Sequence, residues 1–164
     1  MTPAHAERLR RVVEACTPLL LALPDGATAR RPAPEKWSPR EILGHLIDSA
    51  ANNHRRFVEA QLREDLVFPG YDQEAWVRTQ AYRAREWKEL IELWRAYNLH
   101  LAHVMEIAPP AVRTSSRVKH NLADIGWDVA PERPVTLDFV MSDYVGHLEH
   151  HLRQILGTLP GPEW

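Results

Sequence analysis

Two histidines, His147 and His151, lie four residues apart in the last long apolar segment of the sequence. On a helix this spacing places both imidazoles on one face, one turn apart. Two imidazoles arranged in this way can bind one metal ion without any bend in the backbone. The same spacing also occurs between histidines that are only solvated or hydrogen-bonded, so the pair indicates a metal site only together with a further ligand.

A third histidine, His45, begins a polar stripe in an earlier segment. Ser49, Asn52 and Arg56 follow it in steps of three or four residues, so the four side chains share one face of a helix. Neighbouring apolar residues can supply the packing of this helix. The polar stripe therefore predicts the lining of a cavity in which these three side chains bind a substrate. For Arg56 the alternative is an ordinary ion pair at the edge of the fold.

The other six histidines are predicted to lie on the surface or in loops: His5, His54, His100, His103, His120 and His150. The single cysteine, Cys16, lies on an apolar helical stripe, which predicts a packing residue and not a reactive thiol. One cysteine can form neither an internal disulfide nor a zinc site built on thiolates. Any metal chemistry in this chain is therefore expected to depend on imidazoles.

Four segments with an apolar period of about 3.6 residues would position these side chains, and they cover residues 3–23, 39–64, 85–108 and 137–156. The second has the clearest start signal, because Ser38 can cap it and Glu41 can return a hydrogen bond to the Ser38 backbone. Pro18 is expected to kink or interrupt the end of the first. No segment alternates as a strand does, so the sequence predicts an all-α four-helix bundle, with one domain over residues 1–164.

The charge balance argues against several classes of partner. The chain has 20 lysines and arginines against 22 aspartates and glutamates, a net charge of -2, whereas a nucleic-acid binder needs a basic excess. The same balance provides no attraction to an anionic membrane. No apolar stretch is long enough to span a bilayer or to act as a targeting segment. We therefore expect a cytoplasmic protein that acts on a small molecule, without nucleic-acid or membrane partners.

Three runs of sequence resemble the DinB-like superfamily: KWSPREILGHLIDS at residues 36–49, PGYDQEAW at residues 69–76 and DYVGHLEHHLRQI at residues 143–155. The resemblance implies a four-helix bundle with a long crossover between its second and third helices. Such a crossover would account for the connection at residues 65–84. The other long connection, residues 109–135, contains the poorest match to the family.

The matching positions imply that the metal ligands are His45, His147 and His151, whereas His150 occupies a position that does not bind the metal. Three neutral imidazoles leave a coordination position open for water or a substrate, as in catalytic sites. Zinc or nickel is the expected ion, with iron or manganese as alternatives. Three carboxylates are expected to lie around the ligands and to orient their imidazoles: Asp48, Glu41 and Asp143.

Characterised members of the superfamily include thiol-dependent transferases. The resemblance therefore implies a metal-dependent thiol S-transferase of detoxification or stress response, which uses bacillithiol, mycothiol or glutathione. Metal-dependent hydrolysis is the second hypothesis, with Glu41 or Asp143 as the general base. A non-catalytic stress protein that binds a metal or small ligand and forms a homodimer is the third. Three tryptophans outside the predicted helices are candidates for a pocket wall or an interface: Trp76, Trp127 and Trp164.

Overall fold

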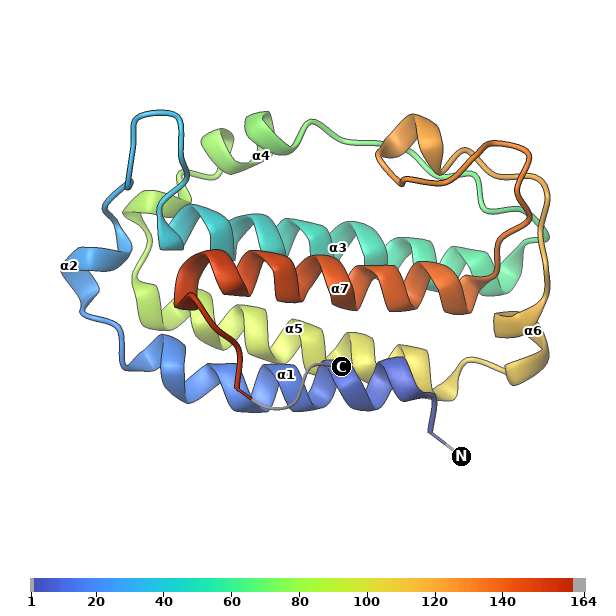
Figure 1. The fold of residues 1–164 in the computed structure, drawn as a ribbon, viewed down its shortest axis with the longest axis horizontal. Coiled ribbons are helices and arrows are strands. Elements are labelled where there is room, and N and C mark those ends of the chain that lie inside the picture. Colours follow the sequence, from blue (N-terminus) through green and yellow to red (C-terminus); the bar gives the residue numbers. More distant parts are fainter. Residues whose placement is uncertain (1, 161–164) are drawn as a thin grey trace.

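Four long helices lie side by side in the computed structural model of the chain, which describes residues 2–160 (Figure 1). They are α1 (Ala4–Leu21), α3 (Pro39–Leu62), α5 (Trp87–Ile107) and α7 (Leu137–Leu156). Short elements occupy the connections between them: α2 (Asp25–Thr28), α4 (Gln73–Thr79), η1 (Tyr82–Ala84), α6 (Pro110–Thr114) and η2 (Ala123–Ile125). No strand forms within residues 2–160, and the predicted all-α four-helix bundle is confirmed.

The core lies between the four long helices. Both α1 and α3 pack against α5 and α7, so each long helix has two long neighbours. Apolar side chains from every helix are completely buried there, among them Leu9, Leu46, Trp94 and Leu148. Burial of this apolar surface is the main force that holds the bundle together. None of the helices within residues 2–160 combines the length and apolar character needed to cross a membrane.

The start of α3 is determined by local hydrogen bonds that the sequence predicts. The Ser38 hydroxyl accepts a hydrogen bond from the Glu41 N–H at 3.3 Å, and the Glu41 carboxylate accepts one from the Ser38 N–H at 2.9 Å. This capping box begins the helix at Pro39. α7 begins in a similar way, because the Thr136 hydroxyl accepts a hydrogen bond from the Phe139 N–H at 3.1 Å. The helices that carry the three candidate ligands therefore both have capped starts.

α1 continues through Pro18, so the predicted interruption is wrong. The Ala22 N–H donates to the Pro18 carbonyl oxygen at 3.1 Å, which keeps the helical pattern up to the last turn. A proline removes the one hydrogen bond that its own nitrogen would donate, and buried side chains on both sides of it hold the helix in place. One of these is Cys16, whose burial raises the pKa of its thiol to about 11. The prediction that Cys16 is a packing residue is confirmed.

The two long connections have different paths. α3 and α5 run in the same direction (Figure 1), so residues 63–86 return along the bundle and form the crossover expected between the second and third long helices. α5 ends near the start of α7, so residues 108–136 stay at that end of the bundle. The connections also bind each other. The Phe68 N–H donates to the Asn121 side-chain oxygen at 2.9 Å, and the Asn121 amide donates to the Phe68 carbonyl at 2.8 Å.

Candidate metal centre

Three imidazoles converge between α3 and α7. His45 comes from α3, and His147 and His151 come from successive turns of α7. The Nε2 atoms of His45 and His147 are 3.3 Å apart, and the His151 ring centre lies 4.7 Å from that of His45 and 4.6 Å from that of His147. One nitrogen from each ring lies within 4.8 Å of the other two. We refer to these three residues as the triad.

The position of His45 depends on close packing around the first turns of α3. The Trp37 ring lies 5.1 Å from the His45 ring, just before the helix begins. On another side, the Tyr82 ring occupies the space next to Gly44, where an added Cβ would lie 2.1 Å from a ring carbon. Only glycine permits this approach, because any side chain would collide with the ring. α3 is therefore held firmly against η1 at the residue that precedes the ligand.

The triad is neutral at physiological pH. Burial, together with the nearby His147 and His151, lowers the pKa of His45 to about 3. Burial and the neighbouring histidines likewise lower the pKa of His147 to about 4, and burial is also the main cause of a lowered pKa at His151. A neutral imidazole keeps a lone pair on one ring nitrogen, which is the form that binds metals.

The geometry of the triad fits a divalent transition-metal ion. Tetrahedral coordination with metal–nitrogen distances of about 2.0–2.1 Å separates two ligand nitrogens by about 3.3–3.4 Å. The Nε2 atoms of His45 and His147 have this separation. The Nδ1 atoms of the same two rings are buried without a hydrogen-bond partner. Two facing Nε2 atoms can share only one hydrogen bond, whereas a cation between them would use both lone pairs.

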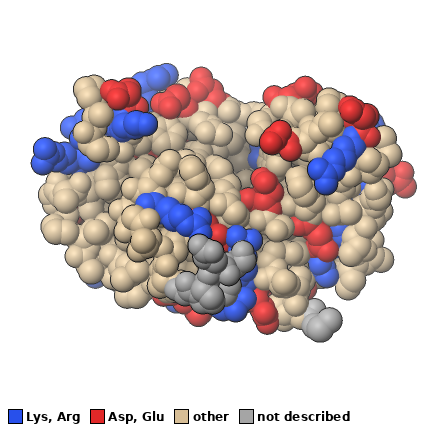
Figure 2. Space-filling model, viewed as in Figure 1, with Lys and Arg blue, Asp and Glu red and all other residues tan. Residues whose placement is uncertain are grey.

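The triad lies between two hollows of different size. A cavity of about 110 Å³ reaches His147, and its wall includes Arg56, Tyr71, Trp127 and Asp143. Its walls come from α3, α7 and both long connections, and Figure 2 shows the surface hollowed between the part that carries α4 and the part that carries η2. We call it the inner cavity. A wide groove of about 1240 Å³ reaches the third histidine of the triad, His151.

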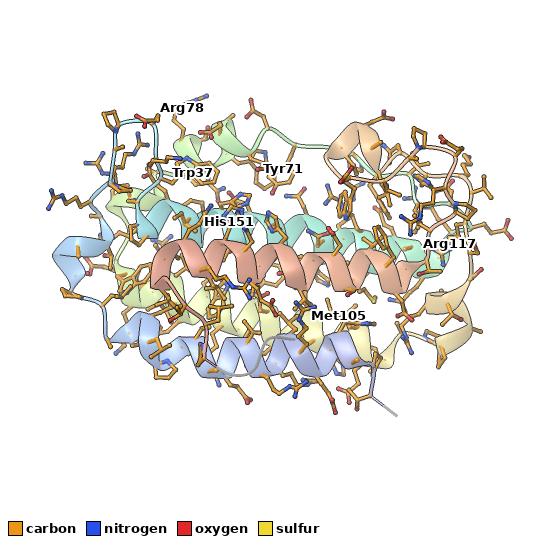
Figure 3. All side chains as sticks on the ribbon, in the orientation of Figure 1. Trp37, Tyr71, Arg78, Met105, Arg117 and His151 are labelled. Carbon is orange, nitrogen blue, oxygen red and sulfur yellow. The ribbon has the colours of Figure 1, made fainter. Side chains whose placement is uncertain are left out.

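The wide groove, which we call the outer groove, runs along the segment between α1 and α3. Its lining includes Arg30, Lys36 and Trp37, together with Gln154 of α7. Trp37 and His151 lie close together in Figure 3, and both line this groove. Two hollows therefore reach the triad, one bordered by His147 and the other by His151.

Two of the carboxylates predicted to orient the ligands have other partners. Asp48 accepts hydrogen bonds from the Tyr82 hydroxyl at 2.6 Å and from the Gln80 amide at 2.7 Å. Glu41 belongs to the capping box and also accepts hydrogen bonds from Arg31. Because the Nδ1 atom of His45 has no hydrogen-bond partner, neither carboxylate orients that ring in this structure. The third, Asp143, is an exposed residue at the inner cavity, and desolvation of its carboxyl raises its pKa.

The four predicted substrate-binding residues divide into two groups. Ser49 and Arg56 line the inner cavity. Asn52 does not line it; its amide donates to the Asp48 carbonyl at 2.9 Å, and the next residue, Asn53, lines the cavity instead. Trp76 lies outside the inner cavity on the exposed side of α4, where its ring centre lies 5.0 Å from that of Tyr71 in a tilted contact. The structure thus corrects the predicted placement of Asn52 and Trp76.

Several residues around the inner cavity come from the connections and carry no helical pattern. Tyr71 and Gln73 belong to the crossover, and Trp127 follows η2. Tyr71 and Gln73 lie within the run at residues 69–76 that resembles the family, which is the one signal that points to them. Trp127 was predicted as a candidate pocket residue, and it lines the cavity. Trp164, predicted in the same group, lies outside the described residues.

The other six histidines were predicted to lie on the surface or in loops, and this prediction is wrong for one of them. His100, His103 and His150 are exposed. His5 is 9% exposed, and its Nε2 atom lies 3.6 Å from an Asp138 oxygen, so the prediction of a surface position for it is wrong. Its burial results from the contact between the start of α1 and the start of α7. The other two are half-buried: His54 and His120.

Comparisons with known proteins agree with this fold. The four-helix bundle of YfiT from Bacillus subtilis matches the structure with a TM-score of 0.77, over 93% of this chain and 82% of that chain, at 18% sequence identity. YfiT is described as a probable metal-dependent hydrolase with an unusual four-helix bundle topology. No curated protein matches the sequence. A family model of the DinB superfamily matches residues 7–155, and the chain therefore belongs to the DinB superfamily.

Proposed function

We propose that the triad holds one divalent transition-metal ion and that the protein is a metal-dependent enzyme. Three neutral, converging imidazoles support this proposal, and the Nε2 atoms of two of them have the separation expected for tetrahedral coordination. Three protein ligands are typical of catalytic zinc sites, whereas structural zinc sites usually have four. An ion bound there would lower the pKa of a bound thiol or water and would act as a Lewis acid. Zinc and nickel both accept a set of three imidazoles.

Among metal-dependent reactions, we propose transfer of a thiol to an electrophile. The observation that carries this proposal is the position of the triad between two hollows, because a reaction of two substrates needs two binding sites that meet at the reacting atoms. The inner cavity, of about 110 Å³, reaches His147 and would hold only the part of the thiol compound that carries the sulfur and a short carbon chain. The outer groove reaches His151 and would hold the larger electrophile. In the reaction, the thiol loses its proton to solvent, a sulfur–carbon bond forms, and the leaving group departs with its electron pair.

The protein itself supplies no thiol to this site. Cys16 is buried on α1, is not among the residues that line either hollow, and has a raised thiol pKa. A low-molecular-weight thiol must therefore come from outside, and bacillithiol, mycothiol and glutathione are the proposed candidates. The role of the protein's own residues is to keep the imidazoles neutral, to bind the two substrates and to hold them next to each other.

The test is an assay of thiol conjugation by zinc-loaded and nickel-loaded protein. Monobromobimane would serve as the electrophile, with each of the three thiols supplied separately. We expect conjugation above the uncatalysed rate with at least one thiol, and loss of this activity in His147→Ala. The matched control is His100→Ala, which removes an exposed imidazole of α5. Failure of every thiol to react faster with metal-loaded protein than without it would exclude the transferase proposal.

Metal-dependent hydrolysis is the second candidate, and the position of Asp143 favours it. This carboxylate borders the same cavity as His147, and its raised pKa brings it nearer to the range of a useful general base. The description of YfiT as a probable metal-dependent hydrolase is consistent with this chemistry. Ester or amide hydrolysis by metal-loaded protein without any thiol, reduced in Asp143→Asn, would favour hydrolysis over transfer.

A further inference from the structure

We propose that the inner cavity is a binding site for a small carboxylate, with Arg56 as its anchor. The Arg56 side chain extends from α3 into this cavity, about three turns beyond His45 on the same helix. The residue is 5% exposed. A guanidinium in this position must remain charged, because arginine does not lose its proton in proteins. The partners of that charge therefore decide what the cavity can bind.

The hydrogen bonds of Arg56 within the protein are long, and their acceptors are neutral. One nitrogen donates to the Asn53 side-chain oxygen and another to the Pro69 carbonyl, both at 3.4 Å. Typical N–H···O hydrogen bonds are about 2.9–3.0 Å long. Among residues 2–160, no carboxylate lies within 4.0 Å of the Arg56 guanidinium. Asp143 borders the same cavity but lies beyond that distance.

Two other buried arginines show how this protein usually compensates such a charge. Arg40 pairs with Asp25 at 2.8 Å, and Arg113 pairs with Asp138 at 2.5 Å. Arg117 also lacks a carboxylate within 4.0 Å, but it borders a different hollow at the far end of α3. Of these four buried arginines, only Arg56 both lacks a carboxylate partner and lines a cavity that reaches the triad. A buried charge without a partner is costly, and an anion in the cavity would remove that cost.

The surroundings of Arg56 favour a planar anion of small size. The guanidinium carbon lies over the Trp127 ring, 4.9 Å from its centre, in a cation–π contact. A planar guanidinium can bind a carboxylate through two parallel hydrogen bonds. The cavity volume of about 110 Å³ equals roughly three or four water molecules at about 30 Å³ each. That space suits a carboxylate with a short carbon chain.

The position of the cavity suggests what the carboxylate belongs to. Because the cavity also reaches His147, a ligand bound to Arg56 would direct its other end toward the triad. On the proposed function, on which this step alone rests, the substrate would be a thiol whose carboxylate lies a few atoms from its sulfur. Of the three candidate thiols this description fits glutathione, whereas mycothiol has no carboxylate. The anion site itself depends only on Arg56 and its surroundings, and it can be tested without a metal ion.

The experiment measures propionate binding to the metal-free full-length chain by isothermal titration calorimetry, at constant ionic strength. Propionamide has nearly the same shape without the charge and is the matched ligand control. The variants are Arg56→Gln and Arg56→Lys. Arg78→Gln is the matched protein control, because Arg78 is an exposed arginine on α4 (Figure 3). Far-ultraviolet circular dichroism checks that each variant is folded. If Arg56→Gln fails to fold, Arg56→Lys, which keeps the positive charge, provides the comparison.

We expect propionate to bind the wild-type chain and Arg78→Gln equally well. Affinity should fall by about tenfold or more in Arg56→Gln, and by less in Arg56→Lys, which loses the two parallel bonds but keeps the charge. Equal binding of propionamide, unchanged affinity in both Arg56 variants, or no propionate binding to the wild type would each overturn the proposal. If propionate binding depends on Arg56 but the protein shows no thiol-transfer activity, the transferase function is refuted and the anion site is still supported.

Discussion

Two groups of histidines join α3 to a neighbouring long helix, and only one of them has the arrangement of a metal site. The triad joins α3 to α7, and its ring centres lie 4.6–5.2 Å apart. The other group, which we call the outer histidines, consists of His54 on α3 and His100 and His103 on α5. The ring centres of His54 and His100 are 4.9 Å apart, and those of His100 and His103 are 6.4 Å apart. Within residues 2–160, only the triad brings three ligand atoms together.

The difference between the groups comes from burial and from the partners of the rings. His45 is completely buried, whereas His100 and His103 are exposed. The His54 Nδ1 atom lies 3.3 Å from the Tyr97 hydroxyl, so one of its nitrogens is already engaged. In the triad, the Nε2 atoms of His45 and His147 instead face each other at 3.3 Å. Proximity of imidazoles is therefore not enough for a metal site, which also needs ring nitrogens that face one point.

The largest expected difference between the two groups is in metal affinity. We expect His147→Ala to weaken zinc binding by more than about 100-fold, since loss of a ligand costs more than loss of a residue that only supports one. His100→Ala should retain the wild-type affinity. Elemental analysis after dialysis, followed by competition with a chelating dye, measures both variants. Equal zinc content in the wild type and His147→Ala would show that the triad is not the metal site.

The second difference concerns the effect of pH on the metal-free protein. Because the pKa values of His45 and His147 are lowered to about 3 and about 4, the unfolded chain binds protons that the folded chain does not. Stability should therefore fall as the pH decreases from about 6.5 to about 4, by a few kcal/mol in all, since one pKa unit corresponds to about 1.4 kcal/mol. Urea unfolding at several pH values measures the slope.

His147→Ala removes one of these groups and should reduce that slope, whereas His100→Ala should keep the slope of the wild type. A slope in His147→Ala as steep as that of the wild type would contradict the assignment of the low pKa to this ring. Measurements with saturating zinc should show a stronger loss of stability at low pH, because protons then also compete with the metal.

The third difference is in the packing on the two sides of the triad. Alanine substitutions at two glycines, one on each helix, compare this packing through their effects on stability. Gly44 precedes His45, and an added Cβ would collide with the Tyr82 ring, whereas Gly146 precedes His147 and has no atom within 4 Å of such a Cβ. We expect Gly44→Ala to destabilise the protein by about 1–3 kcal/mol. Gly146→Ala should instead stabilise it by up to about 1 kcal/mol, because alanine favours the helix. Chemical denaturation compares the two, and equal effects would contradict the close approach at Gly44.

The smallest effect is expected among the outer histidines. Tyr97→Phe removes the hydroxyl that lies near His54. This change should reduce the free energy of unfolding by about 1 kcal/mol or less, which is usual for one partly exposed hydrogen bond. Zinc affinity should not change, because the Tyr97 hydroxyl lies with the outer group. A clear loss of zinc in Tyr97→Phe would show that the two groups are coupled.

The features that could be predicted from the sequence are those with short-range signals. The capping box of Ser38 and Glu41 determines where α3 begins, and it depends on residues three apart. The three histidines of the triad could be selected because each lies on a helical face that the 3.6-residue period reveals. Ser49 and Arg56 were placed correctly for the same reason, since they continue the face that begins with His45.

The features that could not be predicted depend on contacts between distant segments. Asp48 lies one turn from His45, but Tyr82, from the crossover, binds its carboxylate. Asn52 and Asn53 are adjacent on α3 and project about 100° apart, and it is Asn53 that lines the cavity, whose walls include residues of both long connections. His5 is buried because α7 covers the start of α1. Periodicity carries no information about any of these contacts.

The separation of His45 and His147 along the chain has a consequence for folding. These ligands are 102 residues apart, and closing a flexible loop of that length costs about 4 kcal/mol of chain entropy. In the folded bundle the two histidines are already adjacent, so metal binding there does not carry this entropy cost. A metal ion would therefore bind the native state far more tightly than the unfolded chain. The ion would then act as a reversible cross-link between two distant helices. At a concentration of about 100 times its dissociation constant, it would stabilise the fold by about 2.7 kcal/mol.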